Sequence, residues 1–307
     1  GKKISSDTTL ERIKALTIPP AWTNVWICPS PTGYLQATGV DDRGRKQYIY
    51  HTDWVKQTQE NKFNSILDFA EVLPKIRNKI YADMQEEELE KDKIIATVIW
   101  LLEHTFIRIG NEEYAKENNS FGLTTLRNRH VKVRGKEVTF EFKGKSGIEH
   151  TVSVSHPKIA KIIKECIELP GYEIFQYVNE DGSKHTVDSA DVNQYLKMVT
   201  GEDITAKDFR TWGATVLSAE TLHGLGPAEN ATQLKKNIAT AVKKASSNLR
   251  NTATVCRKYY IHPVIIETYQ KNILIPHFEK TYASFDREKA KISRPEYATL
   301  TLLQKYS

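Results

Sequence analysis

The sequence predicts an α+β fold, with a small antiparallel β domain at the N-terminus followed by a mainly helical domain that carries an inserted three-stranded β-sheet. Short apolar runs between turn-forming residues occupy residues 19–50. Apolar residues at helical spacing dominate from about residue 54, and strict alternation returns once, between residues 131 and 154. The 307 residues are enough for two domains, and the change of pattern places them at 1–60 and 61–307.

The N-terminal domain is predicted to hold three short antiparallel strands. Its turns are rich in Pro, Gly and Asp, which turn geometries favour. The runs between these turns carry aromatic and β-branched residues, as strands do, and they cover residues 25–28, 34–38 and 47–50.

The second domain is predicted to be helical apart from one sheet. Residues 131–133, 138–142 and 152–154 alternate apolar and polar side chains across two Gly-containing turns, a pattern typical of antiparallel strands. The spacing of apolar residues predicts helices over residues 92–107, 187–199, 206–223, 232–245 and 253–260.

Composition excludes several classes of protein. Hydrophobic residues make up 39% of the chain, which argues against disorder. Cys28, Cys166 and Cys256 are odd in number and far apart, so neither a disulfide framework nor a thiolate metal site is expected. Because the sequence shows neither an apolar run of membrane-spanning length nor a signal-peptide core, it predicts an intracellular protein without a membrane partner.

Positive charge is concentrated in two stretches. The whole chain has 44 Lys+Arg against 38 Asp+Glu, a net charge of +6. Residues 124–164 hold ten basic and three acidic side chains, and residues 235–258 hold seven basic and no acidic ones. A phosphate backbone would require such stretches on one face, and solvated helix and hairpin faces are the alternative explanation.

Familiar cofactor and metal motifs are missing from the sequence. Gly144-Lys145-Ser146 resembles the end of a phosphate-binding P-loop, but position 139, where that motif needs Gly, is Thr139. There is no H-E-x-x-H motif, no EF-hand loop and no close acidic pair at metal-ligand spacing. We therefore expect no cofactor and no metal, and any phosphate chemistry would depend on cationic side chains.

Four residues stand out, although each has an ordinary structural explanation. Arg108 follows an apolar helix, where a cation is favoured by the helix dipole. Lys145 lies at a turn, where a solvated lysine is common. Arg210 lies early in a predicted helix and Tyr260 at the end of another, where an ion pair and simple packing would account for them.

Taken together, the segments around these residues resemble the small type IB DNA topoisomerases of bacteria and poxviruses over almost the whole chain. Five segments occur in the order and spacing of that family, and their combination is far more specific than any one. They are Phe106-Ile107-Arg108-Ile109-Gly110, Gly122-Leu123-Thr124-Thr125-Leu126, Phe142-Lys143-Gly144-Lys145, Lys207-Asp208-Phe209-Arg210-Thr211, and Asn251-Thr252 nine residues before Tyr260.

The resemblance implies the function and the residues that perform it. It implies a topoisomerase that acts on double-stranded DNA as a monomer, in the cytoplasm with the nucleoid or in a virus. The implied catalytic residues are Arg108, Lys145, Arg210, Tyr260 and Asn251, the last standing where poxvirus enzymes have His. The implied DNA contacts are Gln47, Tyr48, Tyr50, Tyr114 and Lys207. Asn111 departs from the basic residue of the poxvirus pattern, so the poxvirus cleavage preference is not expected to carry over.

The residue types suit cleavage of a phosphodiester. A phenol has a pKa near 10 and is a weak nucleophile, so cations must neutralise the phosphate while Tyr260 attacks. Arg108 and Arg210 keep a permanent charge and can bind two oxygens each. Lys145 can protonate the departing 5′-oxygen. The resulting 3′-phosphotyrosyl ester keeps the energy of the broken bond, so rejoining needs no ATP.

Two other functions compete with this interpretation. A tyrosine recombinase has a similar site but normally shows H-x-x-R, whereas this chain has Lys207-x-x-Arg210 and a β-type front domain. A non-catalytic DNA-binding protein would explain the basic stretches but not the joint occurrence of the five segments. Physical reasoning alone does not separate Tyr259 from Tyr260, and only the family spacing selects Tyr260.

Overall fold

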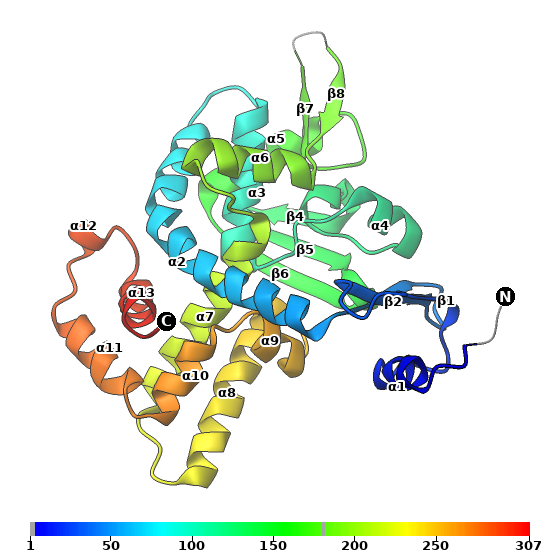
Figure 1. Cartoon of the computed structure of the whole chain (residues 1–307). Helices are drawn as coiled ribbons and strands as arrows, with labels where there is room; N and C mark the ends of the chain where they lie inside the picture. The colour runs from blue at the N-terminus through cyan, green and yellow to red at the C-terminus, as the bar shows by residue number, and fades with distance from the viewer. Residues whose placement is uncertain (1–3, 180–181) are drawn as a thin grey trace. The chain divides into compact units, whose positions relative to one another are not determined.

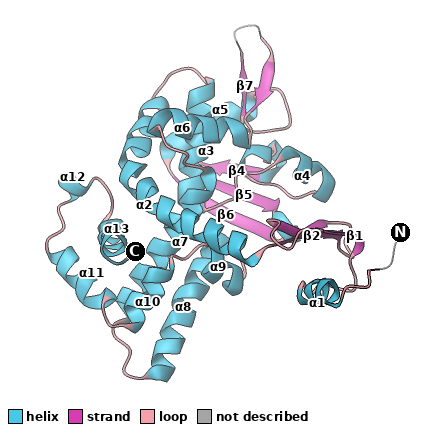
Figure 2. Cartoon of the chain, in the orientation of Figure 1, coloured by secondary structure: helices cyan, strands magenta, loops and turns pink. Residues whose placement is uncertain are grey.

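The computed structural model describes residues 4–179 and 182–307. The α+β prediction is confirmed, because helices predominate and the strands form small antiparallel sheets (Figures 1 and 2). The chain divides into two compact units, one ending at Asn64 and the other beginning at Ser65. The domain boundary predicted near residue 60 lies inside helix α2 (Thr52–Asp83), which continues from the first unit into the second.

The first unit holds the three predicted strands and one helix that the sequence analysis missed. Strands β1 (Thr23–Ile27), β2 (Leu35–Val40) and β3 (Lys46–Tyr50) form an antiparallel sheet in that order. Helix α1 (Asp7–Ala15) precedes them. Its Arg12 donates to Gln36 Oε1 at 2.8 Å and to the Cys28 carbonyl at 2.7 Å, which ties the helix to the sheet.

The second unit contains the inserted sheet in the predicted place. Strands β4 (Val131–Arg134), β5 (Glu137–Lys143) and β6 (Glu149–Ser155) are antiparallel neighbours. Val138, Phe140 and Phe142 on β5 are buried, as the alternation predicted.

Helices make up most of the rest of this unit, and five of them were predicted from the sequence within a few residues. Their bounds are α3 (Lys91–Thr105), α4 (Glu112–Asn118), α5 (Pro157–Glu168), α6 (Ser189–Thr200), α7 (Ala206–Leu225), α8 (Ala231–Leu249), α9 (Ala253–Tyr259), α10 (Pro263–Gln270), α11 (Leu274–Ala283), α12 (Arg287–Ala290) and α13 (Arg294–Tyr306). The structure also contains a hairpin of two three-residue strands, β7 (Gln176–Val178) and β8 (Lys184–Thr186). This hairpin was not predicted, because three residues are too few to show a hydrophobic period.

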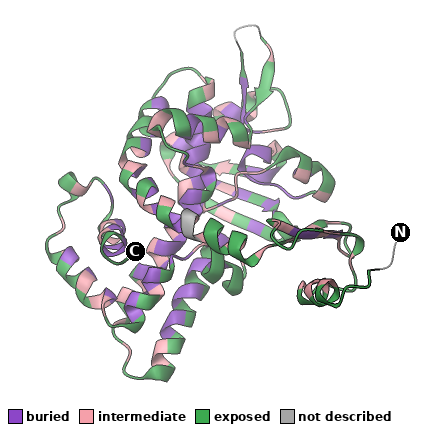
Figure 3. Cartoon of the chain, in the orientation of Figure 1, coloured by how far each residue is buried: buried purple, intermediate pink, exposed green. Residues whose placement is uncertain are grey.

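Helix α3 forms the centre of the core of the second unit (Figure 3). Most of its length is buried, including Ile94, Val98 and Leu102, which have no exposed surface. Across residues 4–179 and 182–307, no helix is both long enough and apolar enough to span a membrane.

Helix α8 is amphipathic, with an apolar face in the core and a basic face toward solvent. Asn230 caps it by accepting from the Gln233 amide at 2.9 Å. One face buries residues 238, 241, 242, 245 and 249 and packs against α7, while the other exposes Lys235, Lys236, Lys243 and Lys244. The basic stretch predicted from the sequence is therefore the solvent face of a packed helix.

The end of α3 corrects one prediction. The helix was expected to reach residue 107, with Arg108 at its C-terminus, but it ends at Thr105. Phe106 adopts a left-handed conformation with φ 54°, and its N–H bonds to the Leu102 carbonyl. Arg108 therefore lies in the irregular segment after the helix and is not a helix-capping residue.

Candidate active site

The segment that carries Arg108 is held by backbone pairing with the Gly122-Leu123-Thr124 stretch. The Leu123 amide donates to the Arg108 carbonyl at 2.9 Å, and the Thr124 amide donates to the Ile109 carbonyl at 2.7 Å. A Cβ atom on Gly122 would lie 2.6 Å from the Arg108 carbonyl oxygen, so glycine is required for this close approach. Two of the five sequence segments thus meet to position one arginine.

Arg210 joins three parts of the chain. It lies in the second turn of α7, a helix that begins with Thr205 and Asp208 bonded in a capping box. Its guanidinium donates to the carbonyl of Phe106 and, at 2.9 Å, to that of Leu249. Arg210 is only 3% exposed, and its buried Nε has no partner among the described residues.

Asn251 lies beside Arg108. The Arg108 guanidinium donates to Asn251 Oδ1, and the Asn251 amide donates to the Ser246 carbonyl at 3.0 Å. Asn251 Nδ2 is buried and has no partner within the described chain. Asn251 Nδ2 and Arg210 Nε are thus two buried N–H donors without an acceptor, and an anionic oxygen is an acceptor of the kind that each lacks.

Tyr260 directly follows α9 as its C-cap residue, and its ring lies against Arg210. The guanidinium carbon of Arg210 lies 5.4 Å from the centre of the Tyr260 ring. Burial raises the pKa of the Tyr260 phenol, but the charge of Arg210 and a hydrogen bond with it outweigh that effect, and the net pKa is below its ordinary value. This geometry separates the two adjacent tyrosines, because Tyr259 is 38% exposed and its ring contacts Lys258.

The two arginines form a positive cluster without a carboxylate. Neither Arg108 nor Arg210 makes an ion pair with Asp or Glu among the described residues. Burial, followed by the charge of Arg108, lowers the pKa of Arg210 to about 10, so its guanidinium stays charged at neutral pH. Buried charge without a counter-ion is costly, and a bound phosphate would offset that cost.

Lys145 is the predicted site residue that the structure does not bring to this cluster. It lies at the exposed tip between β5 and β6, in the short turn η3 (Lys145–Gly147). Its Nζ is 6.0 Å from the centre of the Tyr114 ring. Lys145 and Tyr114, a predicted catalytic residue and a predicted DNA contact, therefore lie together but apart from the contacts of Tyr260.

The other predicted DNA contacts are on the surface or close to it. In the first unit, Tyr48 and Tyr50 on β3 are 48% and 43% exposed, and their rings stack at 6.2 Å. Gln47 donates to Asp41 Oδ2 at 2.9 Å, so its amide is already partly engaged. In the second unit, Lys207 is exposed on the first turn of α7.

His150, which was not among the predicted site residues, lies near the arginines. It pairs with Phe142 across β5 and β6 and is 4% exposed. Burial, followed by the charges of Arg250, Arg108 and Arg210, lowers the pKa of His150 to about 4. Its position on the apolar, inward face of an alternating strand is the signal in the sequence that marks it as a buried histidine.

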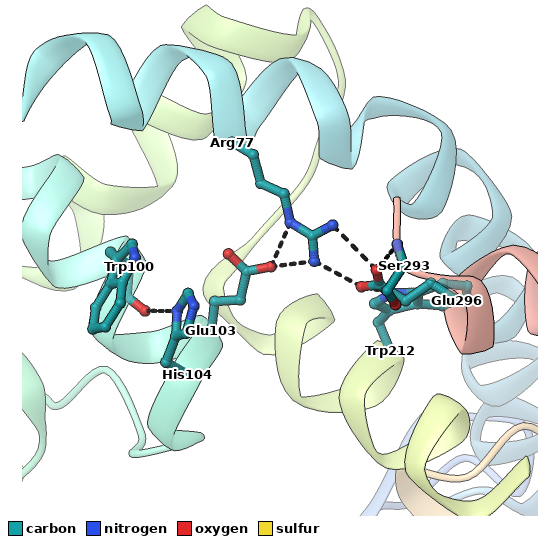
Figure 4. Close-up of polar contacts among 7 residues, drawn as sticks. All are labelled: Arg77, Trp100, Glu103, His104, Trp212, Ser293 and Glu296. Carbon is teal, nitrogen blue, oxygen red and sulfur yellow. Dashed lines mark hydrogen bonds and ion pairs between the residues drawn. The ribbon is translucent and has the colours of Figure 1, made fainter. Parts of the chain in front are cut away.

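A network of charges holds α7 against the helices around it (Figure 4). Arg77 lies between Glu103 and Glu296, at 2.6 and 2.7 Å. Glu296 also accepts from the indole N–H of Trp212, two residues after Arg210, at 3.3 Å. Burial raises the pKa of Glu296, but the hydrogen bond and charge of Arg77 outweigh it and lower the net pKa. The network therefore connects α2, α3, α13 and the helix of the buried arginine.

A cavity of about 770 Å³ lies beside this network, and it is separate from the candidate active site. Phe106 and Trp212 are among its lining residues, whereas Arg108, Arg210 and Tyr260 are not. Within the described ranges, no three His, Cys, Asp or Glu side chains are grouped so that they could hold a metal ion.

Two family models match the chain. Residues 51–287 match the model of the eukaryotic DNA topoisomerase I catalytic core, and residues 1–41 match that of the bacterial DNA topoisomerase IB N-terminal domain. Both models describe DNA topoisomerases, and the first covers more than half of the chain.

Individual proteins agree with these models. The chain is 35% identical to DNA topoisomerase 1B of Acanthamoeba polyphaga mimivirus over 270 residues, which cover 86% of this chain and 80% of that protein. It is 24% identical to DNA topoisomerase 1 of Rabbit fibroma virus over 85% of this chain and 82% of that protein. It is 23% identical to DNA topoisomerase 1B of Vaccinia virus (strain Copenhagen) over 80% and 76%. The chain belongs to the type IB DNA topoisomerase family.

Proposed function

We propose that this enzyme relaxes supercoiled duplex DNA by cutting and rejoining one strand through a 3′-phosphotyrosyl intermediate, without ATP or an essential metal. The observation that carries the proposal is the position of Tyr260 against Arg210, in a buried cationic cluster that contains two unpartnered N–H donors. A phosphodiester would supply the anion that the cationic cluster lacks. Its phosphorus would also be the electrophile that the phenol attacks.

In the first step the Tyr260 oxygen attacks the phosphorus, and the bond from phosphorus to the 5′-oxygen breaks. Arg108, Arg210 and Asn251 Nδ2 bind the non-bridging oxygens, whose charge increases in the transition state. Each such donor is worth on the order of 10²–10³ in rate. Arg210 and Arg108 lower the pKa of Tyr260 despite its burial, and the phenol proton passes to solvent water as the oxygen attacks.

The departing 5′-oxygen takes its proton from Lys145, the proposed general acid. In the structure its Nζ lies near the Tyr114 ring, so the proposal requires the turn to bring the ammonium group to the scissile phosphate. In the reverse step the 5′-hydroxyl attacks the phosphotyrosine and returns the proton to Lys145. No energy source is needed because the number of phosphoester bonds is unchanged.

Binding of duplex DNA is assigned to the two basic stretches and to the further contacts that the sequence predicts. Lys243 and Lys244 are exposed on α8, and Arg134 and Lys136 are exposed at the turn between β4 and β5. Tyr48, Tyr50, Tyr114, Gln47 and Lys207 are the further proposed contacts. The proposal includes action as a monomer, in the cytoplasm with the nucleoid or in a virus, in keeping with the viral relatives.

The test is relaxation of a supercoiled plasmid in EDTA without ATP. The wild-type protein should relax the plasmid through a ladder of topoisomers, and Tyr260→Phe should not. Relaxation only after addition of Mg²⁺ or ATP would refute the proposed mechanism. Recombinant products between two DNA substrates would indicate a tyrosine recombinase instead.

A further inference from the structure

The β5–β6 turn that carries Lys145 rests on a buried histidine. His150 faces Phe142 across the two strands, with ring centres 4.7 Å apart and planes 20° from parallel. A Cβ atom on Gly144 would lie 2.5 Å from His150 Nε2, so this nitrogen lies directly against the backbone of the residue before Lys145. The imidazole therefore contacts the base of the turn.

The turn itself is internally braced. The Gly144 amide donates to the Ile148 carbonyl at 2.8 Å, and the Gly147 amide donates to the Gly144 carbonyl at 3.0 Å. Ser146 and Gly147 both have left-handed φ angles, 65° and 77°. These bonds fix the shape of the turn, and Gly144, at its base, lies against His150.

His150 has polar atoms that packing alone does not need. Both ring nitrogens are buried without a hydrogen-bond partner among the described residues. Burial, followed by the charges of Arg250, Arg108 and Arg210, lowers the pKa of His150 and favours the uncharged imidazole, which has one acceptor nitrogen. Packing on Phe142 needs only the apolar surface of the ring, so the two unpartnered nitrogens are available for a hydrogen bond that this position of the turn does not make.

The cationic side chains near His150 differ in whether their N–H groups are already hydrogen-bonded. Arg108 is bonded to Asn251, Arg210 to the Phe106 and Leu249 carbonyls, and Arg250 to the Thr151 carbonyl at 2.7 Å. Lys145, next to Gly144, has its ammonium near the Tyr114 ring, with no hydrogen bond or ion pair to any residue that the structure describes.

We propose that His150 is a positioning residue for Lys145: its uncharged imidazole supports Gly144 and accepts a hydrogen bond from the Lys145 ammonium when the turn moves from Tyr114 to the scissile phosphate. A second ammonium N–H then points to the 5′-oxygen. A neutral acceptor suits this place, since a carboxylate would pair with Arg108 or Arg210 and withdraw them from the phosphate. The inference rests on the proposed role of Lys145 as general acid.

The experiment uses two DNA substrates that differ in one atom. With a 5′-bridging oxygen the leaving group needs a proton, whereas with a 5′-bridging sulfur it departs as a thiolate, since thiols have a pKa near 8.5. Single-turnover cleavage is measured for the wild type, Lys145→Ala, His150→Leu and His150→Gln. His185→Leu is the matched control, because His185 is exposed on β8.

On the oxygen substrate, His150→Leu should cleave roughly 10–100-fold more slowly, the effect of losing one hydrogen bond to a charged group. His150→Gln keeps a neutral acceptor and should retain most of the rate. On the sulfur substrate, His150→Leu should cleave at nearly the wild-type rate, which also shows that the variant is folded. His185→Leu should match the wild type on both.

The outcomes separate this inference from the proposed function. Absence of covalent attachment in the wild type would refute the proposed function itself, and failure of sulfur to rescue Lys145→Ala would remove the general-acid role and the inference with it. If sulfur rescues Lys145→Ala but not His150→Leu, then His150 acts elsewhere and the inference is wrong. If His150→Leu cleaves the oxygen substrate at the wild-type rate, then His150 serves only in packing and the inference is wrong.

Discussion

At the residue scale, two adjacent tyrosines have opposite surroundings. Tyr260 lies against the buried Arg210, whereas Tyr259 is exposed beside Lys258. Tyr260→Phe should therefore abolish covalent attachment to DNA, because only the nucleophilic oxygen is lost, and it should leave non-covalent binding almost unchanged. Trapping of a labelled strand under denaturing conditions measures the first property, and a filter-binding titration measures the second.

Tyr259→Phe is the matched control for this prediction. The same atom is removed one residue away, so most of the cleavage activity should remain. A labelled strand trapped on Tyr260→Phe, or its loss from Tyr259→Phe alone, would reverse the assignment of the nucleophile.

At the element scale, the approach of α7 to the segment after α3 depends on a glycine. A Cβ atom on Gly213 would lie 2.2 Å from a ring carbon of Phe106. The carbonyl of Phe106 accepts a hydrogen bond from the Arg210 guanidinium. Gly213→Ala should displace this segment and slow cleavage by up to about 10², since shifts of 1 Å can cost that much. Single-turnover cleavage at saturating enzyme measures the effect.

Gly224→Ala in the same helix is its control. A Cβ atom there meets nothing within 4 Å. The change should leave cleavage unchanged and stabilise the helix by roughly 0.5–1 kcal/mol. Equal cleavage rates for the two alanine variants would show that contact between Gly213 and Phe106 does not set the site.

The charge network around α7 predicts a pH-dependent contribution to stability. Glu296→Gln should lower the free energy of unfolding at pH 7 by roughly 1–3 kcal/mol, because Arg77 loses a charged partner. The folded-state pKa of Glu296 lies below its ordinary value of 4.5, so this stabilisation is present above pH 4.5 and is lost as the pH falls through the folded-state pKa.

Urea denaturation of wild type and Glu296→Gln at pH 7 and in acid measures this difference. The two proteins should converge in stability as the pH falls. Glu279→Gln, at an exposed position of α11, should differ little from wild type at either pH. A stability difference that does not change with pH would contradict the ion-pair explanation.

At the scale of the whole molecule, exposed lysines and arginines should make DNA binding depend steeply on salt. Each phosphate contact contributes about 0.9 to the slope of log K against log salt. Lys243→Gln with Lys244→Gln should therefore reduce the slope by about 1.8, and Arg134→Gln with Lys136→Gln should do the same. Titrations at several salt concentrations measure these slopes.

The control pair for this measurement is Lys280→Gln with Lys305→Gln. Both lysines are exposed but lie outside the two basic stretches. Their removal should change the slope by much less than the removal of either basic pair. If all three pairs lower the slope equally, then DNA binding would follow net charge rather than these stretches.

The sequence by itself determined the type and order of most elements, because hydrophobic periodicity is a local property. The inserted sheet and helices α6 to α9 were predicted within a few residues. Very short elements such as β7 and β8 were not, since three residues carry no period. The order of five segments also identified the family, which the two family models and the viral relatives confirm.

Only the tertiary structure decided which atoms meet. Arg210 and Phe106 are 104 residues apart, and Arg108 and Asn251 are 143 apart. The left-handed end of α3 and the inward ring of Tyr260 depend on contacts with distant segments. Local periodicity contains no information about such contacts, because they arise when separate helices pack and close-packed interiors allow few arrangements. For the same reason, the contact of His150 with Gly144 and its closeness to the two arginines could be seen only in the tertiary structure.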